Sequence, residues 1–166
     1  MEIKLPLDIL PPEDIVVDYL NNKRTAKVAA NLIQLQLRNC YEPTAQERNL
    51  ICIEFARAGK PVYGRAFDLY QFESDIARGE ESITKSISAG KLKLLEVKST
   101  NRKGVNDDLK GYFFSLSTAE LLVAQALGDL YQFAFFNTSS KNLQLMTLAD
   151  IYKRARGVYP TWSIKF

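Results

Sequence analysis

The segment that most constrains the fold is an apolar run broken by one acid and one lysine, residues 93–100, with the sequence Lys-Leu-Leu-Glu-Val-Lys-Ser-Thr. This composition predicts a strand, in which alternate side chains point to opposite faces, so Glu96 and Lys98 share a face. The backbone carbonyl of Val97 lies between them. A carboxylate and a carbonyl suit a hard cation, with a charge-stabilising ammonium beside it. A solvated Glu–Lys pair on an exposed strand face is the common alternative.

The absence of histidine is the most useful feature of the composition, because the 166 residues contain none. Nucleophiles activated by histidine and metals with histidine ligands are therefore excluded. Cys40 and Cys52 are too few and too widely spaced for a zinc site or a disulfide framework, which predicts reduced thiols in a cytoplasmic protein. No run suggests a membrane span or a signal peptide, so no membrane partner is expected. Any catalysis must use carboxylates, lysine, hydroxyls or a metal held by oxygen.

The length predicts one compact domain with a sizeable core. We expect an N-terminal arm and helical extension at residues 1–43, followed by the core domain at residues 44–166. Residues 1–12 contain three prolines and read as extended, whereas residues 13–39 carry apolar positions at helical spacing with an expected break at Asn21-Asn22. The formal net charge of +3 permits a nucleic-acid partner without requiring one.

Two capping boxes predict where helices begin in the core region. Thr44–Glu47 opens a helix that ends at Gly59, and Ser117–Glu120 opens one that ends at Gly128, with Glu120 read as a cap. The expected strands cover residues 61–63, 66–72, 91–99, 111–116, 131–136 and 144–148, the expected loops 74–90 and 100–110, and a short basic helix 149–156. The order of helix, three strands, helix and strand predicts an α/β fold with a mixed sheet.

Asp68 is the best candidate partner for Glu96. It stands between Phe67 and Leu69 in an expected strand, where aspartate is disfavoured and an ionised carboxylate needs a partner. If the two strands pair antiparallel, Asp68 approaches Glu96, and a divalent cation relieves the repulsion between them. Lys98 could then orient or deprotonate an attacking water, or stabilise charge on a phosphate. The alternative is an Asp68 at a strand edge that bonds loop backbone.

This arrangement resembles the PD-(D/E)xK nuclease superfamily, and most closely the domain of unknown function found in NO VEIN-type and bacterial restriction-associated proteins. It is also similar to Mrr-type restriction nucleases. The resemblance covers about residues 44–150. The segments that carry it are Ala66–Leu69, Leu95–Thr100, Phe114–Glu120 with Ala124, and Tyr131–Phe133.

The resemblance implies a restriction endonuclease-like αβββαβ core, with a mixed β-sheet flanked by helices, plus the N-terminal helical extension. It implies Mg²⁺ or Mn²⁺ at Asp68, Glu96 and the Val97 carbonyl, with Lys98 catalytic. The expected reaction is endonucleolytic hydrolysis of DNA, in restriction, defence or a mobile element, with a homodimer as one arrangement and no organic cofactor. Some members use an acid from the preceding helix, for which Glu47 is the match, although its capping-box role is an equal alternative. Asp75 competes with Asp68 as the first acid.

Basic residues beside the central strand are the candidate DNA contacts, since they supply affinity that does not depend on sequence. They are Lys91, Lys93, Arg102, Lys103 and Lys110. The alternative for these residues is a solvated loop whose positive charge is diluted by acids. A basic helix end at residues 153–156 is a similar case, and its alternative is a segment that only faces water. Two other functions stay open: a nuclease-fold module that binds nucleic acid or a partner protein without cutting, and a scaffold in which Asp68 and Glu96 lie on separate faces.

Overall fold

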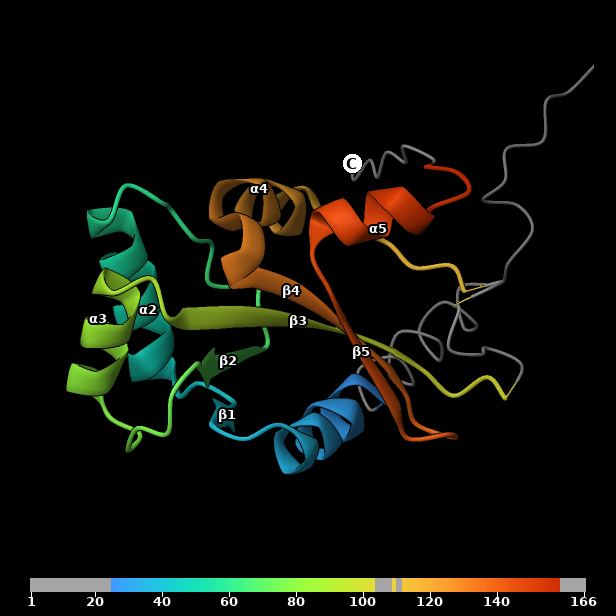
Figure 1. The fold of residues 1–166 in the computed structure, drawn as a ribbon, viewed down its shortest axis with the longest axis horizontal. Helices are drawn as coiled ribbons and strands as arrows, with labels where there is room; N and C mark the ends of the chain where they lie inside the picture. Colours follow the sequence, from blue (N-terminus) through green and yellow to red (C-terminus); the bar gives the residue numbers. More distant parts are fainter. Residues whose placement is uncertain (1–24, 104–108, 110–111, 159–166) are drawn as a thin grey trace, which may run out of the picture.

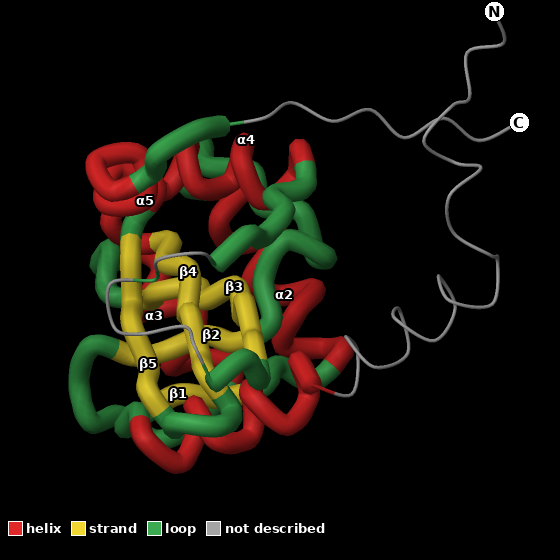
Figure 2. Tube along the Cα trace, turned by 90° about the vertical axis from the view of Figure 1, so that its right-hand side faces the viewer, coloured by secondary structure: helices red, strands yellow, loops and turns green. Residues whose placement is uncertain are grey.

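A five-stranded mixed sheet forms the centre of the protein in a computed structural model that describes residues 25–103, 109 and 112–158 (Figure 1). The strands lie side by side in sequence order, as Figure 2 shows. Their bounds are β1 Cys40–Tyr41, β2 Leu69–Phe72, β3 Leu92–Thr100, β4 Tyr131–Asn137 and β5 Asn142–Met146. Only β3 and β4 run parallel, while the other neighbours are antiparallel. The expectation of an α/β fold with a mixed sheet flanked by helices is confirmed.

Helices cover both faces of this sheet. Figure 1 shows α4 and α5 on one side and the N-terminal helix, residues 25–36, on the other, with α2 and α3 side by side at one end. The remaining bounds are α2 Ala45–Arg57, α3 Glu80–Ser88, α4 Thr118–Leu127, the short 3₁₀ helix η2 Gly128–Leu130, and α5 Leu148–Arg154. The arrangement buries each face of the sheet, as a layered α/β domain requires.

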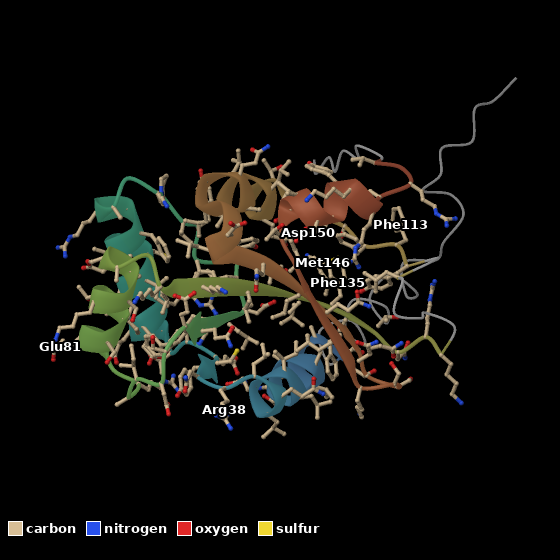
Figure 3. All side chains as sticks on the ribbon, viewed as in Figure 1. Arg38, Glu81, Phe113, Phe135, Met146 and Asp150 are labelled. Atoms are coloured by element: carbon tan, nitrogen blue, oxygen red, sulfur yellow. The ribbon has the colours of Figure 1, made fainter. Side chains whose placement is uncertain are left out.

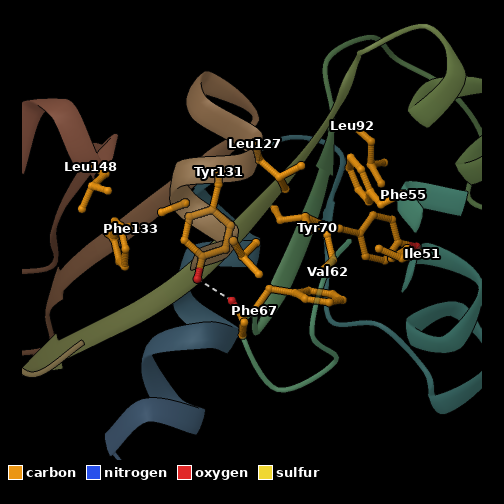
Figure 4. Close-up of a cluster of buried hydrophobic side chains, with 14 of the residues drawn as sticks. Ile51, Phe55, Val62, Phe67, Tyr70, Leu92, Leu127, Tyr131, Phe133 and Leu148 are labelled. Carbon is orange, nitrogen blue, oxygen red and sulfur yellow. Dashed lines mark hydrogen bonds between the residues drawn. The ribbon is translucent and has the colours of Figure 1, made fainter. Parts of the chain in front are cut away.

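Strand β3 divides the core into two clusters by simple alternation. Leu92 and Leu94 point into the larger cluster with side chains of helices α2 to α5, part of which is drawn in Figure 4. Leu95 and Val97 point the other way, into a cluster with Ala29, Ala30 and Ile33 of the N-terminal helix. Since side chains alternate along a strand, Glu96 and Lys98 lie on the α4 side of the sheet.

The predicted capping boxes are present at both helices. Thr44 and Ser117 each accept a hydrogen bond on the side chain from the N–H of the acid three residues on, and the carboxylates of Glu47 and Glu120 each accept one from the N-cap N–H. A third box opens α5, which begins close to the predicted basic helix. Strand β5 therefore ends at Met146, earlier than predicted, because the next residue caps the helix.

The prediction of a loop or lid with at most one helical turn at residues 74–90 is wrong, because this polar stretch contains the nine-residue helix α3 between β2 and β3. The buried side chains Ile83 and Ile87 are spaced by one helical turn, and Glu80 and Glu81 occupy the first turn, where acids are favourable. The order of elements therefore differs from three strands in succession between α2 and α4.

Three predicted strands also differ. Residues 61–63 form no strand, which fits the missing backbone N–H of Pro61. Residues 112–116 form none either, because Tyr112 and Phe114 pack their rings against Phe135 without joining the sheet, while Phe113 stays exposed (Figure 3). Strand β2 begins at Leu69, three residues later than predicted. The expected helix break at residues 21–22 and the aromatic tail from residue 159 lie outside the described residues.

Candidate functional site

Asp68 lies immediately before β2, so its predicted position inside a strand is wrong, although the predicted antiparallel pairing with β3 is confirmed. The last paired residues are Leu69 and Leu95, and one step further Asp68 faces Glu96. The Asp68 N–H donates to the Leu95 carbonyl at 2.9 Å, and the Val97 N–H donates to Asp68 Oδ2 at 2.8 Å. Beyond the end of β2, the Asp68 side chain therefore takes the place of a backbone carbonyl in the hydrogen-bond ladder with β3.

A buried group of charges surrounds Lys98 on the α4 side of β3. Its Nζ lies 3.0 Å from Glu96 Oε1 and 2.7 Å from Glu120 Oε2. The side chains of Lys98 and Glu96 are 12% and 10% exposed, and that of Glu120 is 11% exposed. Glu120 was predicted as a helix cap, which it is, but the same carboxylate also contacts Lys98. Asp68, opposite Glu96, adds a third carboxylate, whose charge interacts with Lys98 and Arg48.

The pKa values follow from this crowding. Burial and then the negative charge of Asp68 raise the pKa of Glu96 well above its usual range, despite the neighbouring Lys98. Burial also raises the pKa of Asp68, although the Val97 N–H and Lys98 favour its ionised form. Burial lowers the pKa of Lys98, but its ion pairs with Glu96 and Glu120 outweigh burial and leave it raised. Asp68 and Glu96 are therefore a pair of like charges held close together in a poorly solvated place.

The turn that carries Asp68 is fixed by two side chains that the sequence did not suggest. Arg48 of α2 donates from Nη1 to the carbonyls of Gly64 and Phe67, each at 2.6 Å, and its guanidinium lies 4.6 Å from the centre of the Phe67 ring. The hydroxyl of Tyr131, at the start of β4, donates to the Ala66 carbonyl (Figure 4). Tyr131 lies in a segment that carries the resemblance, but its contact with this turn, like that of Arg48, depends on the fold.

The donors fit an oxygen-preferring cation by type. Within the part of the chain that the structure describes, Asp68 accepts its hydrogen bond on Oδ2 and Glu96 on Oε1. Their other oxygens, Asp68 Oδ1 and Glu96 Oε2, accept none from the described residues. The N–H of Val97 points to the Asp68 edge of β3, and its carbonyl points to the same edge by the geometry of a strand. Two carboxylates and a carbonyl are donors that Mg²⁺ or Mn²⁺ accepts with added water. No group of three or more acidic or cysteine side chains in the described ranges is arranged to hold a metal.

Glu47 is not brought to this group by the described contacts. Its carboxylate accepts bonds from the Thr44 N–H at 2.8 Å, from the Tyr70 hydroxyl at 3.0 Å, and from Arg78 at 2.8 and 2.6 Å. The hydrogen bond from Arg78 is the main reason that the pKa of Glu47 falls to about 2. Glu47 therefore ties α2 to the segment before α3, and the competing acid Asp75 lies exposed in that segment.

Four of the five predicted DNA contacts lie in the described residues, at both ends of β3 and on one of its faces. Lys91 lies before β3 and Arg102 and Lys103 lie after it, and a strand of 9 residues spans about 30 Å at the usual rise. Lys93 shares the face of Leu95 and Val97, away from Glu96. Lys110 lies outside the described residues.

Comparison with known proteins adds no relative: no family model, no curated protein and no solved structure matches this chain. Within the described ranges, none of the helices combines the length and apolar character that crossing a bilayer needs.

Proposed function

We propose that this chain is a metal-dependent DNA endonuclease built on a restriction endonuclease-like core. The observation that carries the proposal is the meeting of Asp68 and Glu96 where β2 ends, with Lys98 on the same face of β3. Two carboxylates that repel each other in a buried position cost stability, and a divalent cation between them removes that cost. A fold without such a ligand has little reason to hold both acids there.

The roles follow from the donor types. Asp68, Glu96 and the Val97 carbonyl would hold Mg²⁺ or Mn²⁺, which, when bound, offsets negative charge that develops on a phosphate. Lys98 supplies a second positive charge close to the first. Arg48 and Tyr131 keep the turn before Asp68 in place through the backbone carbonyls that they bond. Their contribution is orientation of the site and not contact with the substrate.

The alternative, a module that binds nucleic acid or a partner protein, is supported in its lack of cutting by one specific observation. Lys98 is held by two carboxylates at once, Glu96 and Glu120, so its charge is already neutralised within the protein. A buried charge network of this kind is also found where it contributes to the stability and specificity of the fold and has no catalytic role. The two functions differ in whether metal and substrate change the network.

The deciding experiment incubates supercoiled plasmid, single-stranded DNA and RNA with the protein and either Mg²⁺ or Mn²⁺. We expect cleavage of plasmid by the wild type and at least a ~100-fold slower rate for Asp68→Asn, Glu96→Gln and Lys98→Met. Linear product formed as early as nicked product would indicate a dimer that carries two sites.

The matched controls are Glu81→Gln and Lys85→Met, which remove an exposed ion pair of 2.6 Å on α3. Both should cut as the wild type does. If no substrate is cut with either metal, yet a gel-shift assay shows that DNA is bound, the non-cutting function replaces the nuclease. A fully active Lys98→Met protein would also refute the assignment of these residues.

A further inference from the structure

The acid at the start of α4 is placed to act on Lys98 and not only on its own helix. Of the two carboxylates that contact the ammonium, Glu120 makes the shorter contact, 2.7 Å against 3.0 Å for Glu96. Both contacts are almost excluded from water, and a buried ion pair is screened little. Glu120 comes from a different element than the strand that carries Glu96 and Lys98, so it fixes the ammonium relative to the helix layer.

The capping box makes Glu120 a rigid support. Its Oε2, the atom that contacts Lys98, also accepts the Ser117 N–H at 3.2 Å, and its own N–H donates to Ser117 Oγ at 3.2 Å. The other two boxes in the described part of the chain use their acids differently. Glu47 forms an ion pair with Arg78, and Asp150 lies on the surface beside Lys153. Only the box of α4 among these three reaches the candidate site.

We propose that Glu120 is a positioning residue that holds the ammonium of Lys98 beside the site while Glu96 binds the cation. This inference rests on the proposed function, because it concerns the same site. A cation on the Glu96 carboxylate would reduce its attraction for the ammonium and add repulsion, so Glu96 would not be the main support for Lys98. Glu120 is not among the donors proposed for the cation, so its charge would stay available to Lys98. The ion pair with Glu120 would therefore hold the Lys98 ammonium beside the site when a metal is bound.

The test compares three variants of the full chain. Glu120→Gln removes the charge while its amide oxygen can still complete the capping box, and Glu120→Asp keeps the charge on a shorter side chain. Asp150→Asn is the matched control, because it alters the equivalent capping-box position of α5, where Figure 3 labels Asp150. For each protein we would measure kcat and KM for plasmid cleavage, the Kd for Mn²⁺ by calorimetry, and the ¹H–¹⁵N signal of the Lys98 ammonium, assigned by its loss in Lys98→Met.

We expect Glu120→Gln to lower kcat about 100-fold, as for a misplaced catalytic group, while KM and the Kd for Mn²⁺ change less than about threefold. Glu120→Asp should recover part of that loss, and Asp150→Asn should match the wild type. The ammonium signal should disappear in Glu120→Gln, through faster exchange with water, and persist in the control. A simple loss of folding would instead lower the active fraction and leave kcat per folded molecule unchanged.

Three results would overturn the inference: an unchanged kcat in Glu120→Gln, a large change in its Mn²⁺ affinity, which would make Glu120 a ligand, or an ammonium signal that persists in it. If the wild type cuts nothing, the proposed function fails, and the ammonium signal alone then decides whether Glu120 holds Lys98.

Discussion

The bond network of Glu47 and Arg78 offers a sharp test of the structure that does not depend on any activity. Arg78→Met removes the two hydrogen bonds of 2.8 and 2.6 Å that the guanidinium donates to the buried carboxylate. The carboxylate keeps its bonds from the Thr44 N–H and the Tyr70 hydroxyl but loses its charge partner. We expect a clear loss of folding free energy at neutral pH.

The size of this loss can be worked from the pKa. The network lowers the pKa of Glu47 from 4.5 to about 2. One pKa unit corresponds to about 1.4 kcal/mol, which sets a ceiling of about 3 kcal/mol for the network. The Arg78 side chain is 39% exposed, so screening by water reduces its share, and we expect Arg78→Met to cost about 2 kcal/mol at pH 7.

The pH dependence has a definite sign. A carboxyl whose pKa is lowered on folding stabilises the protein above its unfolded pKa and loses that contribution as the pH falls through its folded pKa. For Glu47 this window runs from about 4.5 down to about 2. The difference between wild type and Arg78→Met should therefore be complete at pH 7 and clearly smaller at pH 3, where only the lost bond to the Glu42 carbonyl and the lost contact with the Tyr41 ring remain in full.

Urea unfolding at pH 7 and pH 3 measures both quantities. Arg57→Met is the matched control, because Arg57 contacts Glu54 at the same 2.6 Å but its side chain is 72% exposed. Exposed pairs contribute little, so this control should cost about 0.5 kcal/mol or less. A difference for Arg78→Met that is no larger than the control, or that is the same at both pH values, would refute the reasoning.

Two further substitutions test the site without requiring a reaction. Glu96→Gln should raise the free energy of unfolding by about 1 kcal/mol at pH 8, because it removes a buried charge that faces Asp68, and the gain should shrink toward pH 5 as wild-type Glu96 takes up a proton. Urea unfolding at the two pH values would show it, and a loss of stability at pH 8 would contradict it. Tyr131→Phe should cost about 1–2 kcal/mol, because the Ala66 carbonyl loses its hydroxyl donor in a buried place. A thermal or urea midpoint equal to that of the wild type would show that water replaces this bond.

Much of the fold could be predicted from local signals. The capping boxes placed the starts of α2 and α4, and the apolar run placed β3 almost to the residue. Helix α3 was not predicted because its sequence is largely polar, and its only apolar side chains that face the core are two isoleucines one turn apart. The aromatic residues at 112–116 were misread because burial against Phe135, and not strand pairing, accounts for their composition. Propensity is a weak guide wherever tertiary packing decides.

The site was predictable only where it lies within β3 and its antiparallel neighbour. Glu96 and Lys98 share a face by alternation, and the pairing of β2 with β3 brings Asp68 opposite Glu96. The contact between Glu120 and Lys98 could not be foreseen, since it requires the position of α4 over the sheet. The same holds for Glu47, for which the sequence offered two roles, and the described contacts show the cap, the bond from the Tyr70 hydroxyl and the pair with Arg78.

The excess of negative charge around Lys98 leads to a last prediction about metal. An ion pair kept only for stability needs one carboxylate for each ammonium, whereas Glu96 and Glu120 both contact Lys98 and the charge of Asp68 acts on Glu96 as well. A divalent cation that binds only the folded protein raises its stability by about 2.7 kcal/mol at 100 times its Kd. We therefore expect Mn²⁺ to raise the unfolding temperature of the wild type but not that of Asp68→Asn, while Asp129→Asn, on the surface after α4, should respond like the wild type. An equal rise in all three proteins would place the metal elsewhere, and the surplus charge would then need another partner.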